Sequence, residues 1–254
     1  MQRGNSKPVA LVTGASYGVG AATALALARE GYDIAVSATQ AENLKPVLTE
    51  LEATKSRVAP LVLDLRSQPS IDRAIAEILT EFGALDVLVN NAATTLRKLA
   101  IDVSQAEWDD VFAANVTGTF FLTQRIGRYL IENGRPGCVV NIVSTHGLVG
   151  TAYQSTYGIS KAALVHMTKV LAIEWGQHGI RINAIAPGRL DTPSPARAVR
   201  TTDPAYMQAM LERIPLHRFA TVQEVAAAVC YLASAQAASI TGHTLVLDGA
   251  LTVA

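Results

Sequence analysis

The sequence predicts a single α/β domain, a doubly wound Rossmann fold around a seven-stranded parallel sheet. Short β-branched apolar runs alternate with longer alanine-rich stretches of helical spacing over all 254 residues. The runs do not alternate apolar with polar side chains, which is typical of strands covered by helices on both faces. No linker, repeat or low-complexity tract divides the chain, and 50% of its residues are hydrophobic, enough for one large core.

The expected elements follow one another in strand and helix alternation. Strands are predicted at Val9–Thr13, Ile34–Ser37, Leu61–Leu63, Val87–Asn90, Cys138–Val143, Ile180–Ala186 and Thr244–Leu247. Helices are predicted at Ala21–Arg29, from near Tyr157, and at Thr221–Ala233. Residues 187–215 collect prolines and charges, and we expect 189–215 to form a substrate-binding lid within the domain 1–254.

The composition favours a small-molecule ligand. Lys plus Arg (21) balances Asp plus Glu (21), which argues against nucleic acid, an anionic membrane or an acidic partner. Cys138 and Cys230 lack metal-ligand spacing and are expected to be reduced core residues, and the histidines form no metal motif, so no metal site is predicted. No signal-like or membrane-length apolar run is present, and a cytoplasmic location is expected.

A glycine-rich turn follows the first strand. Thr13–Gly20 leads directly into an alanine-rich helix. Glycines let the backbone approach a pyrophosphate, whose charge is stabilised by amides and by the helix dipole. A tight turn without a ligand is the alternative.

Polar or small residues also stand where the other strands end. Asp64 follows the third strand, Asn90–Ala93 the fourth, Ser144 the fifth and Pro187–Gly188 the sixth. Because ligands of open parallel sheets bind beyond the carboxyl ends of the strands, this placement predicts a dinucleotide site. Ordinary turn chemistry explains any one of these residues alone.

Tyr157 and Lys161 stand four residues apart on one predicted helix, shortly after Ser144. With the TGxxxGxG loop, the Asn90–Ala92 triplet, Asn115 and Pro187–Gly188, this order resembles the short-chain dehydrogenase/reductase family over nearly the whole chain. The resemblance implies a nicotinamide-dependent oxidoreductase in which Asn115, Ser144, Tyr157 and Lys161 form the catalytic set.

The resemblance also implies cofactor contacts along the strand ends. Asp64 is expected to contact adenine, Asn90 to support the cofactor ribose and Thr192 to meet the nicotinamide carboxamide. The full expected set is Gly14, Ser16, Tyr17, Gly18, Val19, Gly20, Ala38, Thr39, Asp64, Leu65, Asn90, Ala92, Tyr157, Lys161, Pro187, Gly188, Leu190 and Thr192.

The chemistry also follows from the side chains. Hydride transfer to a carbonyl carbon leaves negative charge on oxygen, which requires a proton donor and hydrogen bonds. The pKa of a free tyrosine is about 10, and a nearby Lys161 cation favours the phenolate of Tyr157. Ser144 is expected to bind the substrate oxygen. Asn115 is expected to order a water that links Lys161 to solvent, or else to bend or cap a helix.

The cofactor preference is predicted from the end of the second strand. That end reads Ser37-Ala38-Thr39-Gln40, without the acidic residue typical of NAD sites. This favours NADP over NAD, although Tyr17 and Thr39 stand where NADP-dependent relatives often carry arginine. Arg66 and Lys45 are candidate partners of the 2′-phosphate, or plain surface charges.

Four residues flank the predicted reaction centre and the lid: His146, Tyr153, Gln154 and Arg189. Their hydrogen-bonding groups favour a sugar, polyol or sugar acid over a lipid, and each also fits a loop, packing or surface role. The alternatives are a 3-oxoacyl thioester reductase and a non-catalytic dinucleotide-sensing regulator. The first is disfavoured because Thr94–Lys98 lacks the Thr-Arg-Asp sequence typical of ketoacyl-carrier reductases. The resemblance also implies a homotetramer with subunit contacts at Thr221–Ala233 and Thr244–Leu251.

Overall fold

The computed structural model describes residues 7–191 and 204–254. Seven strands form one parallel sheet in the order β3-β2-β1-β4-β5-β6-β9, which confirms the predicted doubly wound fold. The strands are β1 (Val9–Val12), β2 (Asp33–Ala38), β3 (Val58–Val62), β4 (Val87–Asn90), β5 (Gly137–Ile142), β6 (Ile180–Pro187) and β9 (Thr244–Leu247).

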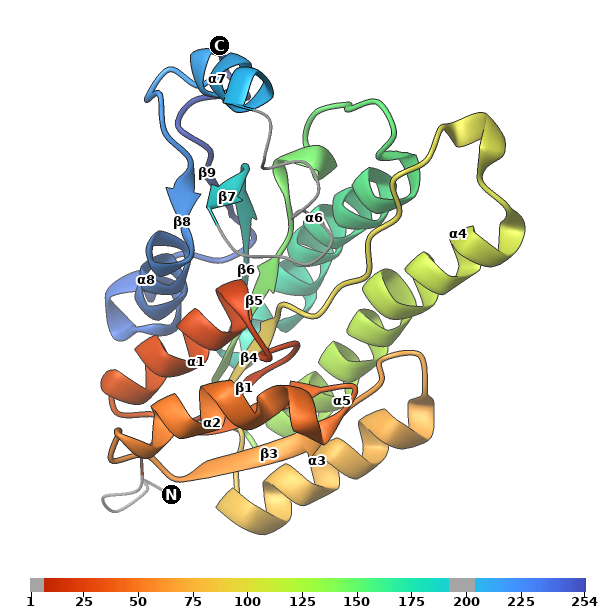
Figure 1. Ribbon diagram of the computed structural model, residues 1–254. Helices are drawn as coiled ribbons and strands as arrows, with labels where there is room; N and C mark the ends of the chain where they lie inside the picture. Colours follow the sequence, from red (N-terminus) through yellow and green to blue (C-terminus); the bar gives the residue numbers. More distant parts are fainter. Residues whose placement is uncertain (1–6, 192–203) are drawn as a thin grey trace.

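Helices cover both faces of the sheet (Figure 1). One core lies against α1, α2 and α8, and a second core lies against α3, α5 and α6. The α-helices are α1 (Gly18–Arg29), α2 (Lys45–Glu52), α3 (Gln68–Phe82), α4 (Gln105–Phe112), α5 (Thr119–Glu132), α6 (Ser155–Trp175), α7 (Pro204–Glu212) and α8 (Val222–Ala233). The 3₁₀-helices are η1 (Ala41–Leu44), η2 (Ala100–Asp102), η4 (Thr145–Gly147), η5 (Gly176–His178) and η6 (Ala235–Ala237).

A π-helix, η3 (Ala113–Gly118), joins α4 to α5 without a break in the chain's helical path. Single π-helical turns inside longer helices frequently occur at functional sites. Here the distorted turn contains Asn115, whose side chain is fully buried.

The structure extends two predictions made from the sequence. Strand β3 begins at Val58 and runs through Pro60, because an edge strand tolerates a residue that lacks an N–H donor. A second, two-stranded sheet pairs β7 (Leu190–Asp191) with β8 (Ala220–Thr221), and these runs are too short to show a strand period in the sequence.

Strand order reverses between β1 and β4, the neighbours at the centre of the sheet. In such folds the crevice for a ligand opens at this switch point, beyond the carboxyl ends of the strands. Across the described ranges no helix combines the length and apolarity that a bilayer crossing requires. In the same ranges no cluster of three His, Cys, Asp or Glu side chains is arranged to hold a metal ion.

Candidate active site

The loops after β1 and β4 are joined through Thr13. Its Oγ1 accepts hydrogen bonds from the backbone N–H groups of Asn91 and Ala92, both at 3.0 Å. The amide of Asn91 donates to the carbonyls of Thr13 and Gly14, both at 2.9 Å. Gly14 has φ +63°, and a Cβ there would lie 2.8 Å from Cα of Ala92. Only glycine fits this contact, which brings the two loops together at the switch point.

The start of α1 is suited to bind an anion. Tyr17 precedes the helix in an extended conformation, no side chain caps the first turn, and that turn contains no acidic residue. By contrast, Ser67, Ser104 and Thr221 cap α3, α4 and α8. The uncapped amides and the positive end of the helix dipole fit the diphosphate of a dinucleotide.

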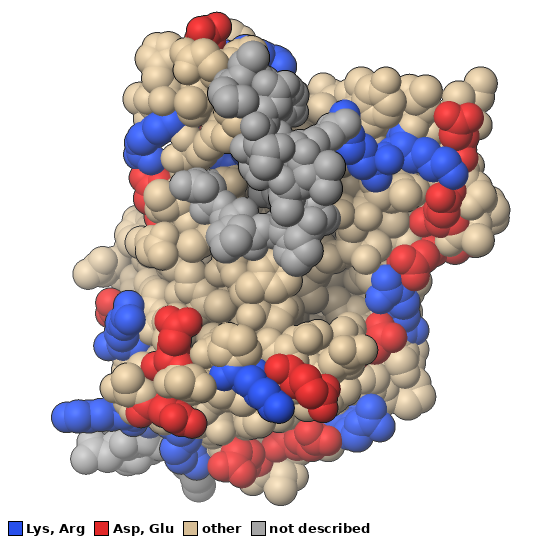
Figure 2. All heavy atoms as spheres, in the orientation of Figure 1, with Lys and Arg blue, Asp and Glu red and all other residues tan. Residues whose placement is uncertain are grey.

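The distribution of charged side chains indicates which groups would bind a diphosphate at the start of α1. Figure 2 shows Lys, Arg, Asp and Glu at the top and upper left, across the lower part and on the right, whereas other residue types form the middle where it is not covered by grey atoms. A diphosphate at this place would therefore depend on backbone N–H donors rather than on a basic patch.

Ser144, Tyr157 and Lys161 are brought together by close packing of η4 on the first turns of α6. Ser144 follows β5, and its Oγ accepts a hydrogen bond from the N–H of His146 at 3.2 Å. A Cβ on Gly147 would lie 2.8 Å from the carbonyl carbon of Lys161, and one on Gly158 would lie 2.8 Å from the carbonyl oxygen of His146. These glycines permit backbone contact that larger residues would prevent.

Lys161 is 2% exposed and lies beside Tyr157. Its Nζ donates to the carbonyl of Ile142 at 2.8 Å and lies 5.6 Å from the centroid of the Tyr157 ring. Burial lowers the pKa of Lys161 from 10.5 to about 8. Within the described part of the chain no other acceptor binds Nζ, so two of its three N–H donors remain for ribose hydroxyls.

Asn115 is held between the loop after β4 and α6. Its Oδ1 accepts from the N–H of Thr94 at 2.8 Å, and its Nδ2 donates to the Thr94 carbonyl at 2.9 Å and to Oγ of Ser160 at 3.0 Å. Oγ of Ser160 in turn donates to the carbonyl of Tyr157 at 2.7 Å. Both N–H donors of the Asn115 side chain are therefore engaged, and its Oδ1 accepts one hydrogen bond, so the side chain is fixed between this loop and α6.

The other expected cofactor residues occupy the same edge of the sheet. Asp64 has a half-exposed carboxylate, while Leu65, Ala38 and Leu190 are buried and Tyr17 and Thr39 are exposed. The side chain of Asn90 points inward, donating to Thr123 and Asn141 at 2.9 and 2.8 Å, so its direct contact with a ribose would come from the main chain. Of the remaining members, Ser16 and Ala92 lie on the loops after β1 and β4, whereas Gly18, Val19 and Gly20 form the first turn of α1. Pro187 ends β6 and Gly188 follows it, and Thr192 lies outside the described residues.

The structure separates the four expected substrate residues. His146 makes an edge-to-face contact with Tyr157, with 6.1 Å between ring centroids. Gln154 is half-buried before α6, and its carbonyl accepts from the N–H of Gly158 at 2.7 Å. Tyr153 is 44% exposed, has φ 66°, and stacks with Arg97 at 4.8 Å.

Arg189 is directed toward α7, which lies within the predicted lid, and toward Phe219, which follows it. It contacts the sulfur atoms of Met207 and Met210 at 3.4 and 2.9 Å and lies 5.2 Å from the ring centroid of Phe219. These contacts tie the residue before β7 to α7. Arg189 therefore contributes to the packing of this region in addition to any role toward substrate.

Sequence reasoning missed several polar residues that organise the site. Thr13, Asn91 and Ser160 all belong to recognised sequence patterns, but their hydrogen-bond partners are far away in the chain. Arg66, considered as a phosphate partner, instead forms ion pairs with Asp64 and Asp110. Lys45 makes no ion pair among the described residues and stays the candidate for a 2′-phosphate.

Fold and site together define a dinucleotide-dependent oxidoreductase with a tyrosine and lysine pair. The sequence model described as enoyl-(acyl carrier protein) reductase matches residues 14–252. The chain belongs to the short-chain dehydrogenase/reductase family, and it is an NAD(P)-dependent oxidoreductase of the class that acts on CH–OH groups.

Relatives with different substrates resemble the chain to similar degrees. It is 36% identical over 249 residues to the 3-oxoacyl-(acyl-carrier-protein) reductase FabG of Thermotoga maritima, covering 96% of this chain and 98% of that one. It is 37% identical over 245 residues to D-threitol dehydrogenase of Mycolicibacterium smegmatis, covering 96% and 93%.

Among solved structures, a protein of Agrobacterium tumefaciens assigned as a 2-deoxy-D-gluconate 3-dehydrogenase, with bound NADP, superposes with a TM-score of 0.89. It is 32% identical to this chain, and the superposition covers 98% of each chain. Membership of this family makes the cofactor a nicotinamide dinucleotide.

Proposed function

We propose that the protein interconverts a secondary alcohol and a ketone on a small polar substrate, such as a sugar, polyol or sugar acid, with NADP preferred over NAD. The observation that carries this proposal is the packing of η4 on α6. That packing holds the segment after Ser144 against the first turns of the helix that carries Tyr157 and the buried Lys161.

The roles follow from the chemistry of each side chain. When bound, the nicotinamide ring supplies or accepts the hydride. Tyr157 transfers the proton at its phenol oxygen, and Ser144 Oγ donates a hydrogen bond to the substrate oxygen, where charge develops. Lys161 binds the ribose hydroxyls and favours the phenolate of Tyr157. Asn115 holds the loop after β4 against α6 and orders a water that links Lys161 to solvent.

NADP is the proposed cofactor because nothing at the end of β2 repels a 2′-phosphate. Ala38 and Thr39 replace the carboxylate that would bind a ribose diol. Lys45 stands at the first position of α2, after η1, and is exposed. Titration with both reduced cofactors tests the preference, and tighter binding of NADH than NADPH would contradict it.

A polar substrate is proposed because His146 contacts Tyr157 and because Tyr153 and Gln154 directly precede α6. A lipid would leave their polar groups unpaired. The similarity to a polyol dehydrogenase and to a protein assigned as a sugar-acid dehydrogenase supports this choice. The similarity to a 3-oxoacyl reductase keeps an acyl thioester as the second candidate. Residues 189–215 are proposed as the substrate lid, although 192–203 lie outside the described residues.

The test is a screen of polyols, sugars, sugar acids, ketones and a 3-oxoacyl thioester with both cofactors, followed by absorbance of the reduced nicotinamide. Tyr157→Phe removes only the hydroxyl, so kcat on any substrate found should fall by about 10²-fold or more while cofactor binding persists. A folded variant with near-normal turnover would rule out the proposed role. Cofactor binding without turnover of any compound would favour the dinucleotide-sensing alternative.

A further inference from the structure

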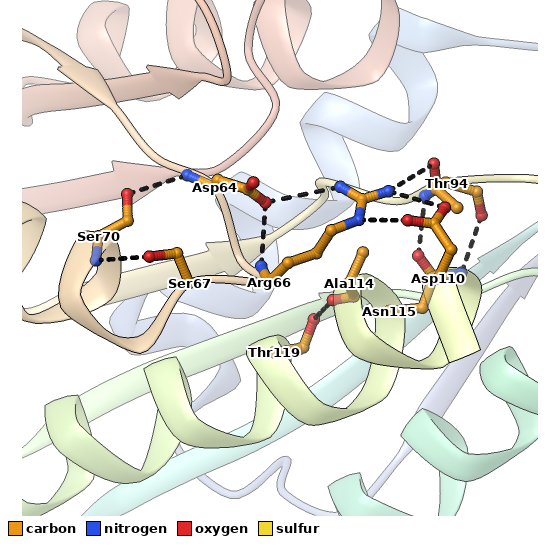
Figure 3. Close-up of polar contacts among 9 residues, drawn as sticks. All are labelled: Asp64, Arg66, Ser67, Ser70, Thr94, Asp110, Ala114, Asn115 and Thr119. Atoms are coloured by element: carbon orange, nitrogen blue, oxygen red, sulfur yellow. Dashed lines mark hydrogen bonds and ion pairs between the residues drawn. The ribbon is translucent and has the colours of Figure 1, made fainter. Parts of the chain in front are cut away.

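Arg66 joins three segments of the chain at the edge of the proposed cofactor site (Figure 3). Its Nε and one terminal nitrogen donate to the two carboxylate oxygens of Asp110 on α4, at 2.7 and 3.0 Å. The same terminal nitrogen donates to Oγ1 of Thr94, after β4, at 3.4 Å. The other terminal nitrogen lies 3.5 Å from Oδ1 of Asp64, whose carboxylate also accepts from the Arg66 N–H at 3.0 Å.

These contacts continue without a gap to the proposed reaction centre. Thr94 exchanges two backbone hydrogen bonds with the amide of Asn115, at 2.8 and 2.9 Å. Asn115 then donates to Ser160, and Ser160 donates to the Tyr157 carbonyl, at 3.0 and 2.7 Å. A chain of direct polar contacts therefore connects Asp64 with the helix turn that holds Tyr157.

A backbone contact supports the same connection independently. A Cβ on Gly118 would lie 2.0 Å from the carbonyl oxygen of Leu65, so the loop after β3 lies directly against the end of η3. Arg66 holds α4 through Asp110, just before η3 begins. The loop therefore contacts the helical path on both sides of Asn115.

The energetics favour a positioning role over a stabilising one. The side chains of Arg66 and Asp110 are 34% and 53% exposed, and ion pairs this exposed contribute little to stability. Bidentate geometry, however, fixes direction as well as distance. The hydrogen bond between the two groups raises the pKa of Arg66 and lowers the pKa of Asp110, so both stay charged at neutral pH.

We propose that Arg66 is a positioning residue that couples the adenine end of the cofactor site, at Asp64, to the placement of Asn115 and Tyr157. The inference rests on the proposed function. A loop ordered by the cofactor at Asp64 presents Arg66 to Thr94 and Asp110, and by reciprocity their contacts favour the loop conformation that binds cofactor.

The test compares Arg66→Ala and Arg66→Lys with Arg57→Ala. Arg57 precedes β3 and pairs through its Nε with Asp33 at 2.9 Å, so it offers an Arg–Asp ion pair at the opposite end of the same strand, with a buried rather than a half-exposed carboxylate. Arg66→Ala should raise the Kd for the reduced cofactor, measured by its fluorescence, and lower kcat, each about three- to tenfold. Arg66→Lys should give a smaller change in both, and Arg57→Ala should change neither.

A double-mutant cycle separates coupling from simple destabilisation. Thr94→Val removes the hydroxyl that accepts from Arg66, so its effect on kcat should be smaller in the Arg66→Ala background than in the wild type. Additive effects, or an unchanged cofactor Kd in folded Arg66→Ala, would overturn the inference. If Arg66→Ala does not fold, Asp110→Asn tests the same contact from the other side. Failure of the wild type to bind either cofactor would instead refute the proposed function.

Discussion

Lys161 shows how strongly a single residue can depend on its surroundings. The side chain is 2% exposed and its pKa is lowered to about 8 by burial. A buried ammonium costs folding free energy, and that cost is retained beside a tyrosine whose phenolate it favours. The proposed role of Lys161 in binding the ribose and tuning Tyr157 explains why this cost in stability would be retained.

Lys161→Met should raise the free energy of unfolding below pH 8. There both the folded and the unfolded wild type carry the proton, so the buried charge has its full cost. From pH 8 to 10.5 the folded state releases the proton first, so wild-type stability rises relative to the variant. The difference between the two pKa values corresponds to about 3 kcal/mol, which is the gain in the free energy of unfolding expected for Lys161→Met below pH 8. The lost hydrogen bond to Ile142 reduces this gain by about 1 kcal/mol.

Urea unfolding at pH 7 and pH 10 measures this difference. Lys169→Met is the matched control, because Lys169 is exposed on the same helix. It should change stability little and equally at both pH values. A pH-independent difference between Lys161→Met and the wild type would contradict the assigned pKa.

The glycine loop and its neighbours show what an element contributes. Helix α1 could be predicted from its alanine-rich run, and the turn before it from its glycines. That Gly14 faces Ala92 could not be predicted, because this contact joins loops from different parts of the chain. The π-helix was equally hidden, since its residues have ordinary helical spacing.

Gly14→Ala should destabilise the protein more than Gly31→Ala. Both glycines have positive φ, +63° and +92°, so alanine is strained at either position. Nothing lies within 4 Å of a Cβ at Gly31, whereas one at Gly14 would lie 2.8 Å from Ala92. We expect a loss of about 1 kcal/mol for Gly31→Ala and about 3 kcal/mol for Gly14→Ala.

Equilibrium urea unfolding of both variants checks this prediction. Equal losses would show that backbone strain alone matters at Gly14. In that case the tight contact between the two loops would not be needed for stability.

For the whole molecule, the two outer strands of the sheet differ in their expected roles. Both β3 and β9 are edge strands, and each has an exposed valine, Val62 at 45% and Val246 at 37%. The resemblance places subunit contacts at Thr244–Leu251, on and after β9. The homotetramer and the cytoplasmic location predicted from the sequence stay predictions.

Light scattering after gel filtration should give a mass about four times the chain mass of 26.8 kDa. Val246→Asp places a charge in the predicted interface and should lower this mass. Val62→Asp, on the opposite edge of the sheet, should not. A monomeric wild type, or the same mass for both variants, would contradict the predicted interface.

What could be read from the sequence depended on local spacing. Burial on both faces predicts parallel strands, and a four-residue interval predicts that Tyr157 and Lys161 share a helix face. Both properties follow from the geometry of one element, so the fold class and the order of the candidate residues were accessible. The start of β3 was not, because only its place at the edge of the sheet explains Pro60.

The sequence by itself determined that a parallel α/β domain carries a glycine loop and a tyrosine and lysine pair. Only the tertiary structure decided that Arg66 pairs with Asp110, 44 residues away, and that Arg189 contacts the methionines of α7. The physical reason is that the repeat of a helix or strand sets which way each residue faces. Partners from distant segments are decided by how those elements pack.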